Sequence, residues 1–310
     1  MVRILLRRLM MLPPLLLAVS LMIFAAVHAM PGDPARLMAG PQATTEAVDA
    51  MRVRLGLDRP PGAQYLVFLE HALHGDLGLS LSSGLPVTQE IAGHLPYTAG
   101  LATVGELLAI GLGIPLGLLA AIGRGGAFDR AVVSLSAIGA SVANFWAALM
   151  LMELFAVRLR WLPLLGAGDW RHYVLPSIVL AILPTALILR MTRAGMIEVL
   201  RQDYMRTAHA KGLSRTAIYL RHGLRNALSP VVTVVALNFG SLIGGAVITE
   251  TVFDWPGLGR LLVDSVRMRD YPVIQGMTLL AVLVVVLANL AGEIAILLLN
   301  PQLRPQYRDA

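Results

Sequence analysis

The side chains that could do chemistry are few, and their spacing excludes most enzyme classes. The chain has no cysteine, so it has neither a thiol nucleophile nor a disulfide framework. Its single lysine, Lys211, follows an alanine, so no Gly-Lys pair is present to hold the phosphates of a nucleotide. The seven histidines show no metal-binding spacing, and no Gly-x-Ser-x-Gly sequence marks a nucleophilic serine. We therefore expect a chain that is not itself an enzyme and carries no cofactor or metal.

One carboxylate lies deep within an apolar stretch of the sequence. Glu106 falls inside the run 97–121. Ionisable groups inside a membrane are costly and often serve transport, so Glu106 is a candidate for a transport pathway. A paired, purely structural carboxylate is the alternative.

The densest group of basic side chains lies in 190–229, which holds eight of them. Asp203 is suited to begin a short helix and Gly212 to end it. Ser214 can cap a second helix that runs through Arg225. The two would form a compact projection, but from charge alone a basic helix lying on anionic lipid is an equal interpretation.

The composition of the chain indicates that helices in a lipid environment position the residues named above. The chain of 310 residues is 56% hydrophobic and only 14% charged, with a mean hydropathy of +0.70. Such a composition is typical of membrane proteins. We predict an all-α integral membrane protein of about six transmembrane helices, in the apolar runs 9–29, 97–121, 132–155, 174–192, 231–252 and 275–298. A cleaved signal peptide ending at Ala29 is the alternative for the first run.

The distribution of arginines predicts the orientation. With the N-terminus in the cytoplasm, the cytoplasmic segments hold most of the basic residues, and the acids lie mainly on the other side. This arrangement follows the positive-inside rule and puts both termini in the cytoplasm. It also accounts for a pI near 10.1 without a nucleic-acid partner.

Two loops are too long to be simple connections, and they divide the chain. In the outer loop, Thr44 or Thr45 with Glu46 is expected to begin one helix, and a second is expected from Gln64 to Leu73. The predicted parts are the N-terminus with the first helix (1–30), an external helical cap (31–96), a transmembrane core (97–300) that contains a cytoplasmic loop (197–225), and a cytoplasmic tail (301–310).

Several motifs resemble those of ABC importer permeases. Arg206-Thr207-Ala208, followed after three residues by Gly212, resembles the EAA loop of that class. The longer string 203–214 is similar to the dipeptide, oligopeptide and nickel branch in particular. Further matching stretches lie at 31–34, 55–58, 75–78, 113–117, 144–146, 221–228, 250–260 and 269–275. Because they run along nearly the whole chain, their combination is specific.

The resemblance implies the permease subunit of an ATP-driven importer that takes up di- or oligopeptides. Nickel or glutathione uptake is the alternative within the family, and a secondary transporter driven by an ion gradient is the alternative from another class. The implied partners are a paralogous permease subunit in a heterodimer, two ATPase subunits that use ATP and Mg²⁺, a periplasmic or lipid-anchored substrate-binding protein, and the lipid bilayer. The implied location is the bacterial inner membrane.

The resemblance also implies roles for individual residues. The helix at 203–212 would be the coupling helix, seated in an ATPase subunit through Asp203, Tyr204, Arg206, Thr207, Ala208, Ala210, Lys211 and Gly212. Asn144 and Trp146 join Glu106 as candidates for the transport pathway. The outer cap and the last outer loop would form the docking face for the binding protein, with Asp254, Trp255, Arg260 and Asp270 as the named contacts.

Overall fold

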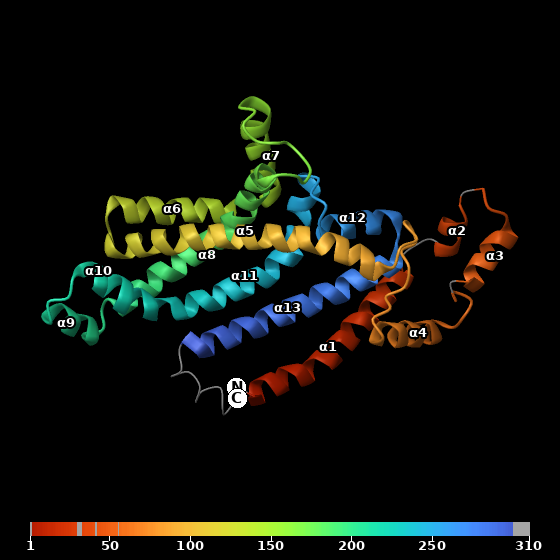
Figure 1. Cartoon of the computed structure of the whole chain (residues 1–310), viewed down its shortest axis with the longest axis horizontal. Helices are drawn as coiled ribbons and strands as arrows, with labels where there is room; N and C mark the ends of the chain where they lie inside the picture. The colour runs from red at the N-terminus through yellow and green to blue at the C-terminus, as the bar shows by residue number, and fades with distance from the viewer. Residues whose placement is uncertain (1, 30–32, 41, 55, 300–310) are drawn as a thin grey trace.

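The computed structural model of the chain describes residues 2–29, 33–40, 42–54 and 56–299, so the predicted tail 301–310 lies outside them. Within these ranges every regular element is a helix, apart from one isolated bridge between Leu79 and Pro86. Figure 1 shows an elongated bundle with α2, α3 and α4 at one end and α9 and α10 at the other. We call these the cap end and the α9 end.

Five long helices cover five of the six predicted runs. In chain order they are α1 (Val2–Ala29), α5 (Val87–Ile122), α8 (Trp170–Val199), α11 (Arg225–Val252) and α13 (Tyr271–Leu299). Over the described residues, α5, α8 and the Tyr271–Gly292 part of α13 are long and apolar enough to cross a membrane. Because α5 begins ten residues before its predicted span, the cap ends earlier than the boundary predicted at residue 96.

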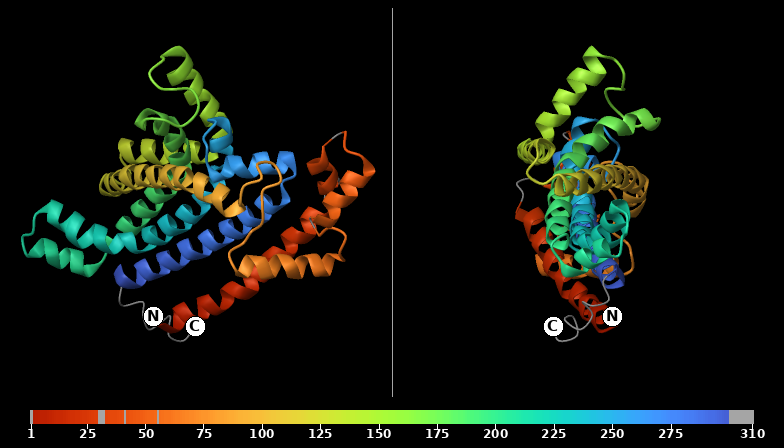
Figure 2. Two further views of the ribbon diagram at one scale, coloured as in Figure 1. Left: turned by 45° about the vertical axis from the view of Figure 1, so that its right-hand side comes forward. Right: turned by 90° about the vertical axis from the view of Figure 1, so that its left-hand side faces the viewer.

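The predicted single helix over 132–155 is wrong. The chain forms α6 (Ala127–Ser141), α7 (Asn144–Leu151) and the π-helical η1 (Met152–Arg158), and it bends by 103° at the break between α6 and α7. Figures 1 and 2 show α7 projecting from the side of the bundle. Ala148 of α7 is buried with Leu175 of α8 and Phe253, and this packing outweighs the continuity of the helix. Counted as one bent span, the pair gives a fourth candidate membrane crossing.

Glycines allow α5 and α8 to pack closely along the middle of the bundle. A Cβ added at Gly113 would lie 2.7 Å from Cγ2 of Ile188, and one at Gly117 would lie 2.6 Å from the carbonyl oxygen of Leu189. Small residues permit such approaches between membrane helices, where van der Waals contact is a main driving force. The α5–α8 pair therefore forms the centre of the fold, with α11 packed against both helices.

The cap contains both of its predicted helices. They are α3 (Thr45–Arg54) and α4 (Pro61–Leu73), preceded by the short α2 (Pro34–Ala39). The Thr44 hydroxyl accepts a 3.3 Å hydrogen bond from the N–H of Ala47, which caps α3 as expected. Helix α4 contacts α1, since the Tyr65 hydroxyl is 2.9 Å from that of Ser20, and Figure 2 shows the two helices next to each other at an angle.

Candidate functional site

The projection at the α9 end begins with the predicted short helix. Helix α9 runs from Asp203 to Ala210, and Gly212 follows with φ of +76°, a left-handed conformation that favours glycine. Met205 and Ala208 are only 4% and 7% exposed, and they pack against Ile218. The inner face of α9 is therefore fixed to the next turn of the chain.

The second predicted helix also forms, but it does not stop at Arg225. The Ser214 hydroxyl caps α10 (Arg215–Ala217) by accepting a 3.3 Å hydrogen bond from the N–H of Ala217. The chain then passes through the π-helical η2 (Ile218–Leu224) directly into α11. The projection is thus the helical connection between α8 and α11, and a displacement of α9 would be transmitted to both.

The outer face of α9 is polar and largely exposed. The side chains of Asp203 and Arg206 are 97% and 81% exposed, and they face each other at 3.7 Å. The Tyr204 hydroxyl accepts a 3.0 Å hydrogen bond from Asn226. Seven of the eight residues predicted for coupling are exposed, and the buried one, Ala208, supports the helix from beneath.

At the cap end, the segment after α11 folds around a buried carboxylate that the sequence interpretation missed. Glu250 is fully buried and accepts hydrogen bonds from the Thr98 hydroxyl at 2.6 Å and the Gly259 N–H at 2.7 Å. The N–H of Arg260 donates a further bond at 3.2 Å. These N–H groups open α12 (Leu258–Met268), where a carboxylate is favoured by the helix dipole. The glycines that follow this glutamate in the sequence could have indicated that the backbone approaches its carboxylate closely.

Two of the four residues predicted to dock a partner are buried. Trp255 is fully buried, its Nε1 donates to the carbonyl oxygen of Tyr97 at 3.2 Å, and its ring packs edge-on against Tyr173. Asp254 and Arg260 lie at the surface, where an ion pair of 2.8 Å joins them. Trp255 thus shapes the loop from within and offers no surface to a docked protein.

Asp270 is the second buried member of that set. Its Oδ2 accepts hydrogen bonds from the hydroxyls of Ser80 and Ser82 at 2.6 and 2.9 Å, and from the N–H of Ser82 at 3.0 Å. The predicted surface contact is therefore corrected to an internal one. Asp270 fastens the loop that precedes α5 to the start of α13.

A family described as binding-protein-dependent transport system inner membrane component matches residues 113–305, and the N-terminal component of the same system matches residues 1–102. The chain belongs to this family of permeases. Its membership confirms the predicted resemblance and makes the chain an integral inner-membrane permease that acts with ATPase and substrate-binding partners.

Curated relatives of the permease extend over almost its whole length. The glutathione transport system permease protein GsiC of Salmonella choleraesuis (strain SC-B67) is 46% identical over 299 residues, which are 96% of this chain and 98% of that protein. GsiC of Escherichia coli (strain K12) is 46% identical over 298 residues, which are 96% and 97% of the two chains.

A solved structure has the same fold. The inward-facing MetNI methionine ABC transporter matches with a TM-score of 0.60 and 18% identity, over 69% of this permease and 97% of that chain. The predicted all-α membrane fold is therefore confirmed.

The three residues predicted for a transport pathway lie on two helices, with Glu106 on α5 and both Asn144 and Trp146 on α7. Glu106 is 4% exposed on α5, and neither of its carboxylate oxygens has a hydrogen-bond partner within the described part of the chain. Trp146 on the projecting α7 is 55% exposed, and Asn144 opens that helix directly after the break.

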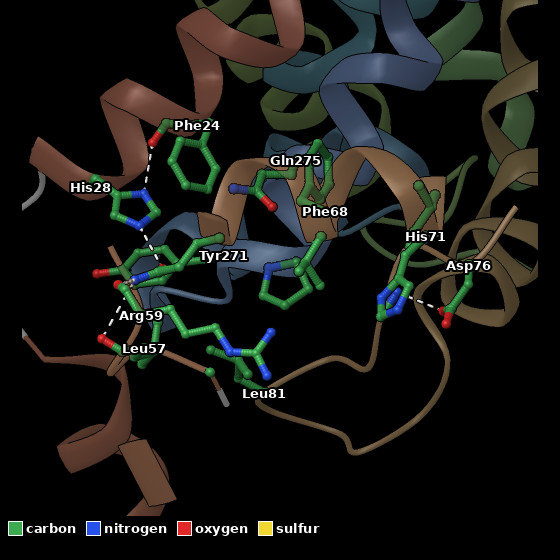
Figure 3. Close-up of a pocket in the computed structure, with 16 residues that line it drawn as sticks. Phe24, His28, Leu57, Arg59, Phe68, His71, Asp76, Leu81, Tyr271 and Gln275 are labelled. Carbon is green, nitrogen blue, oxygen red and sulfur yellow. Dashed lines mark hydrogen bonds between the residues drawn. The ribbon is translucent and has the colours of Figure 1, made fainter. Parts of the chain in front are cut away.

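A cavity of about 260 Å³ lies beneath the cap of the permease. Its walls come from α1, α4, the segment 76–81 and the start of α13 (Figure 3). Figure 3 shows His28 on α1 directed toward the cap, where its Nε2 is 3.0 Å from Oε1 of Gln64. Gln275 of α13 lies near the rings of Phe24 and Phe68 in the same view. The cavity marks where the cap, α1 and α13 meet. Over the described residues, no cluster of three metal-ligating side chains occurs there or elsewhere.

Proposed function

We propose that this permease is the membrane subunit of an ATP-driven importer of small peptides, with glutathione as the first substrate to test. The observation that carries the proposal is the 46% identity to permeases named for glutathione transport, over 96% of this chain. Glutathione uptake was the alternative within the family, and di- or oligopeptide uptake was the leading expectation from the motifs. The relatives' names favour glutathione over a dipeptide.

In this proposal α9 is the coupling helix, and it lies in the cytoplasm within a groove of an ATPase subunit. The outer face of α9 supports that role because five of the predicted residues are exposed on a helix whose inner face is packed, and two more are exposed directly after it. Closure of the ATPase subunits around ATP would push α9, and the push would enter α8 and α11 together. Both termini would lie on the same cytoplasmic side.

One permease chain would form half of the channel, with a paralogous permease forming the other half. The exposure of Trp146 on the projecting α7 supports this view, because 55% of that residue is free to contact a second chain. The bent α6–α7 pair leaves an apolar face on α7, including Phe145 at 54% exposure, that is suited to contact with a second subunit or lipid.

The binding protein would dock at the cap end. Arg260 and Asp254 form the exposed part of the segment that the Glu250 hydrogen bonds hold in shape. A docking surface gains affinity when it is already ordered before the partner arrives. The cap helices α3 and α4 would form the remainder of this face.

The proposal is tested by reconstituting the permease in liposomes with its paralogue, both ATPase subunits and the binding protein. Radiolabelled glutathione, a dipeptide and Ni²⁺ are offered in parallel, with ATP or with an ion gradient alone. We expect ATP-dependent accumulation of glutathione, and no accumulation when the ATPase subunits carry a P-loop lysine substitution. Uptake driven by the ion gradient without ATP, or uptake of Ni²⁺ in place of either peptide, would refute it.

A further inference from the structure

Polar contacts join helix α6 to α8 at two points. Of the 15 residues of α6 only Asp129, Val132 and Ser136 are buried, and the two polar ones accept hydrogen bonds from arginines of α8. We call Asp129 and Ser136, together with their partners Arg190 and Arg193, the α6–α8 clasp. We propose that this clasp transmits a movement of α9 to the bent α6–α7 pair. This inference rests on the proposed function, and it makes Asp129 and Arg193 positioning residues for transport.

The pair of Asp129 and Arg193 is the tighter half of the clasp. Arg193 donates from Nε to Oδ1 at 2.6 Å and from Nη2 to Oδ2 at 2.8 Å. A forked contact of this kind fixes the orientation of both groups as well as their distance. Oδ2 also accepts a 2.8 Å hydrogen bond from the N–H of Gly125, which ties the turn between α5 and α6 to the same carboxylate. The Asp129 side chain is only 4% exposed, so water screens the contact little.

Arg190 supplies the second attachment, one turn earlier on α8. Its Nη2 donates to the carbonyl oxygen of Ser136 at 3.3 Å, and its Nε approaches the Ser136 hydroxyl at 3.4 Å. Asp129 and Ser136 are two turns apart on α6, so the clasp holds this helix at two separate points. Two attachments prevent α6 from rotating about either one.

The clasp lies close to the projection that the ATPase subunits would displace. Helix α8 ends six residues after Arg193, which is about 9 Å of helix at 1.5 Å per residue. Met205 and Ala208 of α9 are buried against Val199 and Leu200 at that end of α8. A movement of α9 therefore displaces the part of α8 that carries the clasp. Through the clasp, α6 follows α8 and moves the bend that precedes Asn144.

The test measures coupling in the complete reconstituted transporter. The variants are Asp129→Asn, Arg193→Gln, their double mutant, and the matched control Arg130→Gln, whose arginine adjoins Asp129 in the chain but is exposed. We expect each single clasp variant to lower glutathione uptake per ATP about tenfold, with the ATP hydrolysis rate retained. The double mutant should lose no more than either single variant, since both remove one contact. Unchanged uptake per ATP in Asp129→Asn, or additive losses in the double mutant, would overturn the inference.

Distance measurements test the clasp without any substrate. The chain has no cysteine, so this subunit can be labelled before assembly at Leu135→Cys on α6 and Arg201→Cys after α8, and its own sequence gives no background. We expect the same narrow distance distribution with and without ATP when the clasp is intact, and a broader one in Asp129→Asn. Arg193→Lys, which keeps the charge but loses the fork, covers the case in which a neutral variant fails to assemble. If ATP already broadens the distance distribution while the clasp is intact, the inference is overturned. Absence of peptide uptake by the unmodified transporter, in contrast, refutes the proposed function alone.

Discussion

The hydroxyl of Thr98 donates a 2.6 Å hydrogen bond to Glu250 and accepts a 2.7 Å bond from the N–H of Leu258. A single buried side chain thus joins α5, the end of α11 and the start of α12. All three partners are at least 97% buried, so none of these polar groups has water as a substitute.

We predict that Thr98→Val lowers the melting temperature of the purified permease. The substitution keeps the shape but leaves the Leu258 N–H unpaired and removes one partner of Glu250, at about 1–3 kcal/mol for an unsatisfied buried group. Thr103→Val is the matched control, because Thr103 is exposed and its hydroxyl bonds only to the carbonyl oxygen of Ala99 in its own helix. Thermal unfolding in detergent gives the comparison, and equal shifts in the two variants would contradict the structural role of Thr98.

Gly117→Ala should destabilise the permease, whereas Gly111→Ala should not. The new Cβ at residue 117 would lie 2.6 Å from the backbone oxygen of Leu189, which cannot move aside as a flexible side chain can. Overpacking of this kind typically costs about 1–3 kcal/mol. Gly111 lies on the same helix with nothing within 4 Å of an added Cβ, so alanine gains helix propensity there. A melting temperature for Gly117→Ala at or above that of Gly111→Ala would show that α5 and α8 pack differently.

Gly212→Val is expected to reduce uptake per ATP while the permease still inserts into the membrane. The residue has φ of +76°, and a β-branched side chain is strained there although nothing lies within 4 Å. The strain would reorient the end of α9 and its contact with the ATPase. Gly212→Asn is the control, since asparagine adopts this conformation more readily. Uptake and ATP hydrolysis are measured on the same liposomes, and a fully coupled Gly212→Val variant would argue against α9 as the coupling element.

Below about pH 4, near the ordinary pKa of an aspartate, stability should fall in part through Asp169. The hydrogen bond from His172 holds the pKa of Asp169 below its ordinary value of 3.8, and the carboxylate also caps α8 through the Arg171 N–H. A lowered folded-state pKa means that the stabilisation is complete above the unfolded-state value and is lost as the pH drops through the folded-state value. Asp169→Asn keeps a capping group but cannot titrate. Its melting temperature should therefore change less between pH 6 and pH 3 than that of the unmodified permease, and parallel curves would contradict the assignment.

Local sequence signals predicted the α9 projection well because its determinants are local. The N-terminal position of Asp203, the left-handed Gly212 and the cap at Ser214 each act within a few residues. Long apolar runs located the spanning helices for a similar reason, since the bilayer requires a minimum length of apolar chain.

The remaining features depend on contacts between distant parts of the chain. No proline or glycine marks the break before Asn144, where packing of α7 on α8 decides the bend. The burial of Asp270 depends on Ser80, 190 residues away, so an acid in an outer loop gave no sign of being internal. Glu250 was overlooked as well, because its partner Thr98 lies 152 residues away.

The length of α5 has a mechanical consequence. Its 36 residues extend over about 54 Å at 1.5 Å per residue, well beyond the roughly 30 Å of hydrocarbon in a bilayer. A helix of this length is long enough for its two ends to reach the water layers on opposite faces of the membrane. A tilt of about 10° around its midpoint would displace the two ends by about 5 Å in opposite directions. A helix that tilts in this way can widen the opening on one face of the membrane while it narrows the opening on the other face.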